Sequence, residues 1–166
     1  MRSMIRSHEI ITPFWNQAPF FDKPPLHLWL GSLGRLVLGE SSLGYRFTSV
    51  ASVFVVLVLT YLYTRKKFGA FAGVTAFLCL VCNEIFIWRG RGANTDGLVT
   101  LLILLVFIAS QLKTKWKYCW LGFLLSLVYL TKSTVVLFPI LSLGLLELSE
   151  LFQQRNTKSS ANELRT

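Results

Sequence analysis

Five long apolar runs, separated by short charged turns, constrain this chain more than any other feature. The chain has 166 residues and is 53% hydrophobic, which is too apolar for a soluble domain of this size. We therefore predict an all-α, polytopic membrane protein with about five transmembrane helices. A perpendicular helix needs about 20 residues to cross a bilayer, so the ends of the shorter runs must reach into the headgroup region. The predicted spans are 45–63, 68–88, 97–112, 116–131 and 133–152.

The basic residues predict the orientation of these spans. The net charge is +9, which in a soluble protein would suggest a nucleic-acid partner, but here topology accounts for most of it. If the chain crosses the membrane five times, the basic clusters at 65–67 and 113–117 lie on the same side of the membrane as the polar stretch 153–166. The positive-inside rule makes that side cytoplasmic. We predict an integral, multi-pass protein of the plasma (inner) membrane, with 44–152 as its membrane region, 153–166 as a disordered cytoplasmic tail, and no nucleic-acid partner.

Residues 1–43 are predicted to form an outer-face loop, and its most distinctive stretch is Asp22, Lys23, Pro24 and Pro25. Each proline forces the residue before it out of the helical region, so Lys23 and Pro24 are extended and stiff. Pro25 suits the first position of a helix. Lys23 thus stands just before a helix N-terminus, where an anion such as phosphate is favoured. The alternative is a rigid entry turn in which Lys23 is solvated.

The helix predicted at 25–38 is apolar except for one narrow strip. His27, Gly31, Gly34 and Arg35 recur at helical spacing and form that strip. This pattern predicts an amphipathic helix that lies along the membrane surface.

The loop at 89–96 is a second candidate site. Arg89 and Arg91 place positive charge on the predicted outer side, against the usual bias, and a bound anion would explain them. In the functional interpretation, the Asp96 carboxylate faces a polar cavity and the Arg91 guanidinium binds phosphate oxygens. In the alternative, one of residues 94–96 simply caps the following helix.

Lys132 and Glu84 are the remaining ionisable candidates. Lys132 ends a predicted span at the outer surface, where a lysine commonly reaches to the headgroups. Glu84 lies inside a predicted span, which favours a functional or ion-pairing role. The cysteines Cys79, Cys82 and Cys119 lie in apolar runs without a second pair for zinc, and we interpret them as small apolar residues.

Several of these stretches occur in the order seen in one known family. They are Ile11-Thr12-Pro13, then Pro19 to Leu30 with its Asp-Lys-Pro-Pro core, Leu43 to Ser49, Lys67-Phe68-Gly69 with Gly73, Arg91 with Thr95 and Asp96, and Leu130 to Ser133. Over roughly residues 8–150, the chain resembles the polyprenyl-phosphate-sugar-dependent glycosyltransferases. This family includes the protein O-mannosyltransferases and the lipid A aminoarabinose transferases.

The resemblance implies a partial GT-C fold with its active site on the outer face. Such enzymes move a sugar from a polyprenyl-phosphate carrier to a protein, lipid or glycan acceptor, so the implied partners are that donor, an acceptor and membrane lipids. No cofactor is assigned, and a divalent metal stays open. The implied catalytic residue is Asp96. The implied substrate-binding residues are Lys23, which is associated with the carrier phosphate, Asp22 of the same motif, Arg91 and Lys132.

Two departures from the family leave two functions open. Ser133 stands where the lysine matching Lys132 is usually followed by glycine. Family members begin with a membrane span and an acidic residue thought to be the catalytic base, whereas Met1 falls in the loop after that acid, and Glu9 does not replace it. The first function is a piece of a glycosyltransferase. The alternative is a non-enzymatic small membrane protein or accessory subunit that binds lipid phosphate.

Overall fold

The computed structural model describes residues 14–15, 18–19, 24–39 and 41–163. Two antiparallel strands of two residues each, β1 (Phe14–Trp15) and β2 (Ala18–Pro19), come before the helices. The predicted all-α class is confirmed, because every later element is helical. These elements are α2 (Leu26–Leu38), α3 (Ser42–Phe68), α4 (Ala70–Val81), α5 (Glu84–Arg91), α6 (Asp96–Ser110), α7 (Lys117–Thr131), the 3-10 helix η1 (Ser133–Val136) and α8 (Leu137–Glu163).

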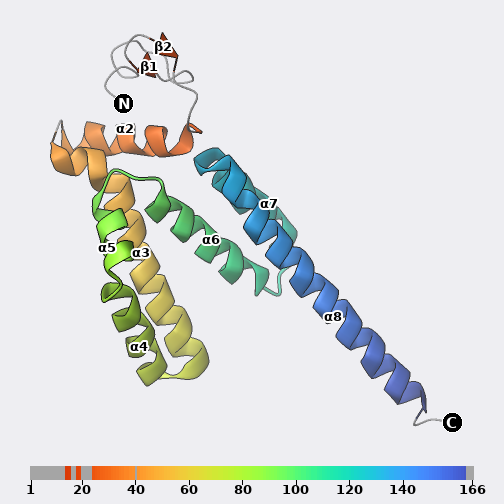
Figure 1. The fold of residues 1–166 in the computed structure, drawn as a ribbon. Coiled ribbons are helices and arrows are strands. Elements are labelled where there is room, and N and C mark those ends of the chain that lie inside the picture. Colours follow the sequence, from red (N-terminus) through yellow and green to blue (C-terminus); the bar gives the residue numbers. More distant parts are fainter. Residues whose placement is uncertain (1–13, 16–17, 20–23, 40, 164–166) are drawn as a thin grey trace.

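The helices alternate in direction between two ends of the molecule (Figure 1). Helix α2 lies across one end, α3 leads away from it, and α4 and α5 return beside α3. Helix α6 leads away again, α7 returns, and α8 leads away to the C-terminus. The start of α2, the α5–α6 loop and the α7–η1 turn therefore share one end, which we call the site end. The turns between α3 and α4 and between α6 and α7 share the other, which we call the basic end after Arg65, Lys66, Lys67, Lys113 and Lys115.

Helix α2 buries its polar strip and exposes its apolar side. His27 and Arg35 are only 5% and 6% exposed, and the Arg35 guanidinium lies 5.1 Å from the centre of the Tyr45 ring. Leu36 and Val37 are 69% and 80% exposed. The polar strip of a surface helix ordinarily faces water, but here α3 packs along part of it. The exposed apolar side is the one suited to lipid.

Helix α3 begins and ends at clear local signals. The Ser41 hydroxyl accepts a hydrogen bond from the Gly44 N–H at 3.1 Å, so Ser41 is a side-chain N-cap. The helix continues past the predicted end at residue 63 to Phe68, because its basic last turn suits a helix C-terminus. It stops at Gly69, whose φ of 94° favours glycine.

The span predicted at 68–88 is instead two helices, α4 and α5, bent by 63°. The break comes at Asn83, whose side-chain oxygen accepts a hydrogen bond from the Phe86 N–H at 2.9 Å and so caps α5. Asparagine strongly favours this position over a helix interior. Glu84 follows the cap as an exposed residue of the first turn, where an acidic side chain suits the helix dipole.

Length and composition alone identify fewer membrane-crossing helices than the five predicted. Among the described residues, α3 is the one helix long and apolar enough, and the bent pair of α4 and α5 adds a second if it counts as one span. Helices α6 and α7 are apolar but have 15 residues each. At 1.5 Å per residue they are roughly 22 Å long, which is shorter than the ~30 Å hydrocarbon core.

The buried core lies between α6, α7 and η1. Its members are Leu98, Leu102, Val106 and Ala109 of α6, Leu121 and Val128 of α7, and Val136 of η1. Large apolar side chains elsewhere are exposed, including Phe71 at 86% and Phe138 at 70%. Exposed apolar surface on this scale indicates contact with lipid or with other protein.

Helix α8 extends to Glu163, so the predicted disordered tail from residue 153 is corrected: most of it is helical. The stretch 153–163 lacks proline and glycine and contains glutamine, arginine, lysine, alanine and glutamate. These residue types make up six of the 11 residues and have high helix propensity, and the helix that continues after the apolar run also contains asparagine, serine and threonine.

Candidate functional site

A polar cavity of about 350 Å³ opens at the site end. Three separate parts of the chain contribute to it: Pro24, two residues before α2; the stretch from the end of α5 to the start of α6; and the turn between α7 and η1. The lining residues are Pro24, Arg89, Asn94, Thr95, Asp96, Thr131, Lys132, Ser133 and Thr134.

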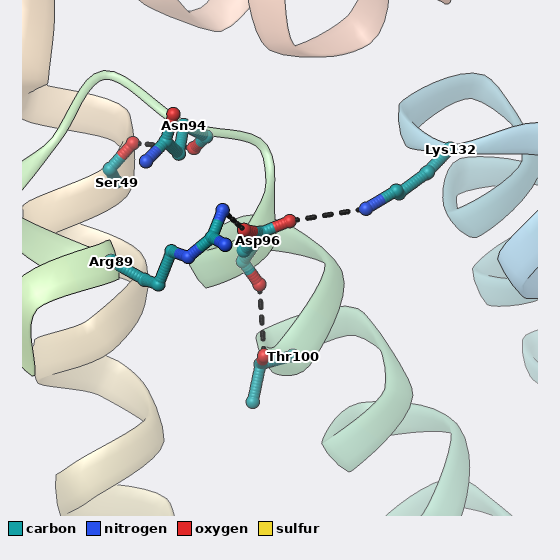
Figure 2. A network of polar contacts seen from close by, with 6 residues as sticks. All are labelled: Ser49, Arg89, Asn94, Asp96, Thr100 and Lys132. Carbon is teal, nitrogen blue, oxygen red and sulfur yellow. Dashed lines mark hydrogen bonds and ion pairs between the residues drawn. The ribbon is translucent and has the colours of Figure 1, made fainter. Parts of the chain in front are cut away.

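The Asp96 carboxylate bridges two cations in this cavity (Figure 2). Its Oδ2 lies 3.1 Å from Nη1 of Arg89, and its Oδ1 lies 3.2 Å from Nζ of Lys132. The three side chains come from α6, α5 and the residue after α7. Arg89 is seven residues from Asp96, whereas Lys132 is 36 residues away, so the second ion pair links distant parts of the sequence. One negative and two positive groups leave an excess of positive charge at the cavity.

The loop that precedes Asp96 is fixed against α3 by a partly buried hydrogen bond. The Ser49 hydroxyl donates to the Asn94 carbonyl oxygen at 2.7 Å, across 45 residues of sequence, and Ser49 is fully buried. The Thr100 hydroxyl donates to the Asp96 carbonyl oxygen at 2.8 Å, within the first turn of α6. Figure 2 shows both contacts beside the ion pairs.

Small residues allow α5 and α6 to approach α3 closely. A Cβ added to Gly90 would lie 2.5 Å from Cγ2 of Val53, and one added to Gly97 would lie 3.1 Å from the Ser49 carbonyl oxygen. These glycines flank Arg89 and Asp96 in the sequence. Their close packing against α3 therefore sets where the two charged side chains emerge.

This geometry distinguishes the residue at the N-cap of α6 from the residue whose carboxylate lies in the cavity. Thr95 occupies the N-cap of α6 without a side-chain capping hydrogen bond, and Asp96 is the first helical residue. The Asp96 carboxylate contacts Arg89 and Lys132, although its position in the first turn still suits the helix dipole.

Lys132 points into the site rather than away from it. It ends α7 in an extended conformation, with φ −157° and ψ 93°, and this bend in the chain directs its amine toward Asp96 (Figure 2). Its side chain is 48% exposed, so the ammonium group is accessible from the cavity.

The other predicted site residues fare differently. Arg91 is exposed and does not line the cavity. Asp22 and Lys23 lie outside the described residues, but Pro24, which follows Lys23 in the chain, does line the cavity. The sequence marked Arg89 as a cation against the charge bias that a bound anion would explain, whereas the structure pairs it with Asp96.

The described residues contain no group of three histidine, cysteine, aspartate or glutamate side chains placed to hold a metal ion. Arg89 and Lys132 give the cavity charged groups that suit an anion. Arginine and lysine provide charge-assisted hydrogen bonds to phosphate or carboxylate oxygens, and the N-terminus of α6 adds a favourable dipole.

Comparison with known proteins identifies the family to which this arrangement belongs. The family described as "Dolichyl-phosphate-mannose-protein mannosyltransferase" matches residues 22–161. An uncharacterized protein of Aquifex aeolicus is 34% identical over 105 residues, which are 63% of this chain and 21% of that protein. An undecaprenyl phosphate-alpha-4-amino-4-deoxy-L-arabinose arabinosyl transferase of Pseudomonas savastanoi is 35% identical over 65 residues, which are 39% of this chain and 12% of that protein.

A solved structure shares the fold. The crystal structure of ArnT from Cupriavidus metallidurans in the apo state matches with a TM-score of 0.69 at 21% identity, over 79% of this chain and 26% of that one. The chain thus spans about a fifth of the Aquifex protein and about a quarter of the ArnT chain.

Proposed function

This chain belongs to the dolichyl-phosphate-mannose-protein mannosyltransferase family, and we propose that it provides the carrier-phosphate site of a membrane glycosyltransferase. The donor would be a sugar on a polyprenyl phosphate, and the acceptor a protein, lipid or glycan. A similar protein of Pseudomonas savastanoi is named an undecaprenyl phosphate-alpha-4-amino-4-deoxy-L-arabinose arabinosyl transferase, which supports a donor of this class.

The observation that carries the proposal is the cation pair at the cavity. Arg89 and Lys132 converge on one point from different elements, and both remain about half exposed. A donor phosphate carries negative charge and several acceptor oxygens, which match a guanidinium and an ammonium group placed side by side. Lys23, which precedes the cavity residue Pro24, is proposed as a third phosphate ligand.

The chemistry proposed for the site is substitution at the sugar carbon that is bonded to the carrier phosphate. An acceptor oxygen forms a bond to this carbon, the bond from the carbon to the phosphate oxygen breaks, and the lipid phosphate leaves with the bonding electrons and takes up the proton of a hydroxyl acceptor. Arg89 and Lys132 stabilise the negative charge that develops on the leaving phosphate. Asp96 lies where its carboxylate would stabilise positive charge developing on the sugar.

We place this chemistry on the outer face of the plasma (inner) membrane. The site end carries α2 with its exposed apolar side, and the basic end carries the lysines and arginines that favour the cytoplasm. The donor's polyprenyl chain would remain in the bilayer while its phosphate enters the cavity.

Arginine-to-glutamine changes at two neighbouring positions test the proposal. Binding of polyprenyl phosphate to the full chain in lipid nanodiscs is measured for the wild type, Arg89→Gln and the matched control Arg91→Gln. We expect Arg89→Gln to weaken binding about tenfold, the value of a charge-assisted contact at a partly exposed site. Arg91→Gln should bind like the wild type. Equal binding by all three proteins would reject the cavity as the phosphate site.

A further inference from the structure

The Asp96 carboxylate occupies the cation pair that we assign to the phosphate. We propose that Asp96 is a built-in competitor of the carrier phosphate, displaced from Arg89 and Lys132 when the phosphate binds and returning to them as it leaves. This inference rests on the proposed function and adds to it a control on how tightly the phosphate is held.

The contacts show why the two anions compete. Asp96 uses both of its oxygens, one for each cation, at 3.1 and 3.2 Å. A phosphate group also presents two oxygens on one central atom, so it would bridge the same guanidinium and ammonium groups in the same way. Both anions cannot occupy the bridging position at once.

The exposure of the three side chains makes the exchange feasible. The side chains of Arg89, Asp96 and Lys132 are 53%, 33% and 48% exposed. Ion pairs this accessible to water are individually weak, so another anion that presents two free oxygens, as the phosphodiester of the donor does, can replace the carboxylate. The N-cap position of α6 belongs to Thr95, and the carboxylate contacts of Asp96 are those with Arg89 and Lys132.

Displacement has two consequences for the proposed reaction. With the donor bound, the Asp96 carboxylate is released from its cations and is available beside the sugar. After transfer, the carboxylate competes again for Arg89 and Lys132, which weakens retention of the lipid phosphate product. The same residue thus limits affinity and takes part in the chemistry.

The sharpest test is a variant that should bind more tightly than the wild type. Asp96→Asn keeps the size of the side chain but removes the competing charge and its repulsion of phosphate. We expect polyprenyl phosphate to bind the full chain in nanodiscs about five- to tenfold more tightly, as one removed like-charge interaction near a protein surface implies. Glu84→Gln, which removes an exposed acid that lies away from the cavity lining, should leave the affinity unchanged.

The possible outcomes separate this inference from the proposed function. Measurable binding by the wild type with equal or weaker binding by Asp96→Asn overturns the competition alone. No binding by either protein overturns both proposals. If Glu84→Gln also binds polyprenyl phosphate more tightly, the gain in affinity comes from the overall charge of the protein, and this result also overturns the competition. If Asp96→Asn does not fold, Asp96→Ser serves in its place, since serine is well tolerated at a helix start and also lacks the charge.

Discussion

Asp96 begins α6, but its carboxylate contacts two side chains from other elements. The sequence left two interpretations of this residue, a helix cap and a functional carboxylate. The structure gives the N-cap position to Thr95 and brings Asp96 together with Lys132, which the sequence had also proposed as a site residue. A helix cap requires only a side-chain oxygen that accepts a hydrogen bond, whereas a functional carboxylate requires the negative charge. The charge of Asp96 therefore distinguishes the two interpretations.

The first prediction concerns that charge and transfer activity. In a chimera in which this chain replaces the matching segment of a full-length relative, Asp96→Asn should lower sugar transfer by about a hundredfold or more, because a charge aimed at the reacting centre is lost. The thermal unfolding midpoint should stay within a few degrees of the parent. Parental transfer rates would remove Asp96 from the catalytic site. Donor binding by the chimera without any transfer, even with Asp96 intact, would favour the lipid-phosphate-binding alternative.

The second prediction concerns Lys23, which lies outside the described residues and precedes Pro24, a lining residue of the cavity. Lys23→Ala should weaken binding of polyprenyl phosphate about ten- to a hundredfold, the worth of a charge-assisted contact. Lys23→Arg should restore only part of the affinity, since a planar guanidinium replaces a compact ammonium group. Lys115→Ala, an exposed change at the basic end, is the matched control. Unchanged binding by Lys23→Ala would favour the alternative interpretation, in which Lys23 is a solvated residue of a rigid turn.

Among the secondary-structure elements, α5 shows why part of the site was not predictable. The sequence treats residues 89–96 as one loop and selects Arg91 as the cation that binds phosphate oxygens. Arg89 and Arg91 are both helical in the structure, and residues two apart on a helix point to different sides. Only Arg89 therefore faces Asp96. Helix α5 exists as a separate helix because the chain bends at Asn83. The apolar run predicted as one span at 68–88 does not indicate this bend.

The same reasoning explains which elements the sequence predicted well. Helices at 25–38, 97–112 and 116–131 match α2, α6 and α7 closely, because proline, aspartate or charged turns bound their apolar runs. The packing partners were not predictable. A single sequence does not indicate that Ser49 holds Asn94, or that α3 covers the polar strip of α2, since both contacts join segments that only the fold brings together.

The third prediction tests the close approach of α5 to α3. Gly90→Ala would place a Cβ 2.5 Å from the stiff, β-branched Val53 side chain, and overpacking of this kind costs roughly 1–3 kcal/mol. The thermal unfolding midpoint should fall by a few degrees. The change should also weaken phosphate binding, because Arg89 is displaced with the helix. Gly122→Ala is the control on α7, where no atom lies within 4 Å of the new Cβ.

The control Gly122→Ala is expected to change the thermal unfolding midpoint in the opposite direction or not at all. Alanine has a higher helix propensity than glycine by about 1 kcal/mol, so Gly122→Ala should keep or slightly raise the unfolding midpoint. Equal midpoints for Gly90→Ala and Gly122→Ala would show that α5 can move away from α3 without cost.

Over the whole molecule, the alternating helices separate two kinds of surface. The basic end carries exposed lysines and arginines together with Trp116 and Tyr118, which are each 67% exposed. The Tyr63 and Phe107 rings, 5.7 Å apart, bring the last turns of α3 and α6 together there. Aromatic and basic residues are both enriched where helices leave a bilayer, the basic ones on the cytoplasmic side.

The fourth prediction follows from that separation. Single cysteines at Ala93 and Ser133, which are exposed at the site end, should react with a membrane-impermeant reagent added from outside the cell. A cysteine at Thr114, in the α6–α7 turn of the basic end, should react only after the membrane is opened. The parent for these variants has Cys79, Cys82 and Cys119 replaced by alanine, since all three are exposed in the fold.

The short helices α6 and α7 decide the outcome of this labelling test. Each is shorter than the hydrocarbon core, so they cross it only if flanking residues such as Lys113 and Lys117 extend to the headgroups or the bilayer thins locally. If α6 and α7 instead form a re-entrant pair, the cysteine at Thr114 will not become reactive from the cytoplasmic side. Labelling of Ala93 and Thr114 from the same side would reject the threading and, with it, a cavity that opens on the outer face.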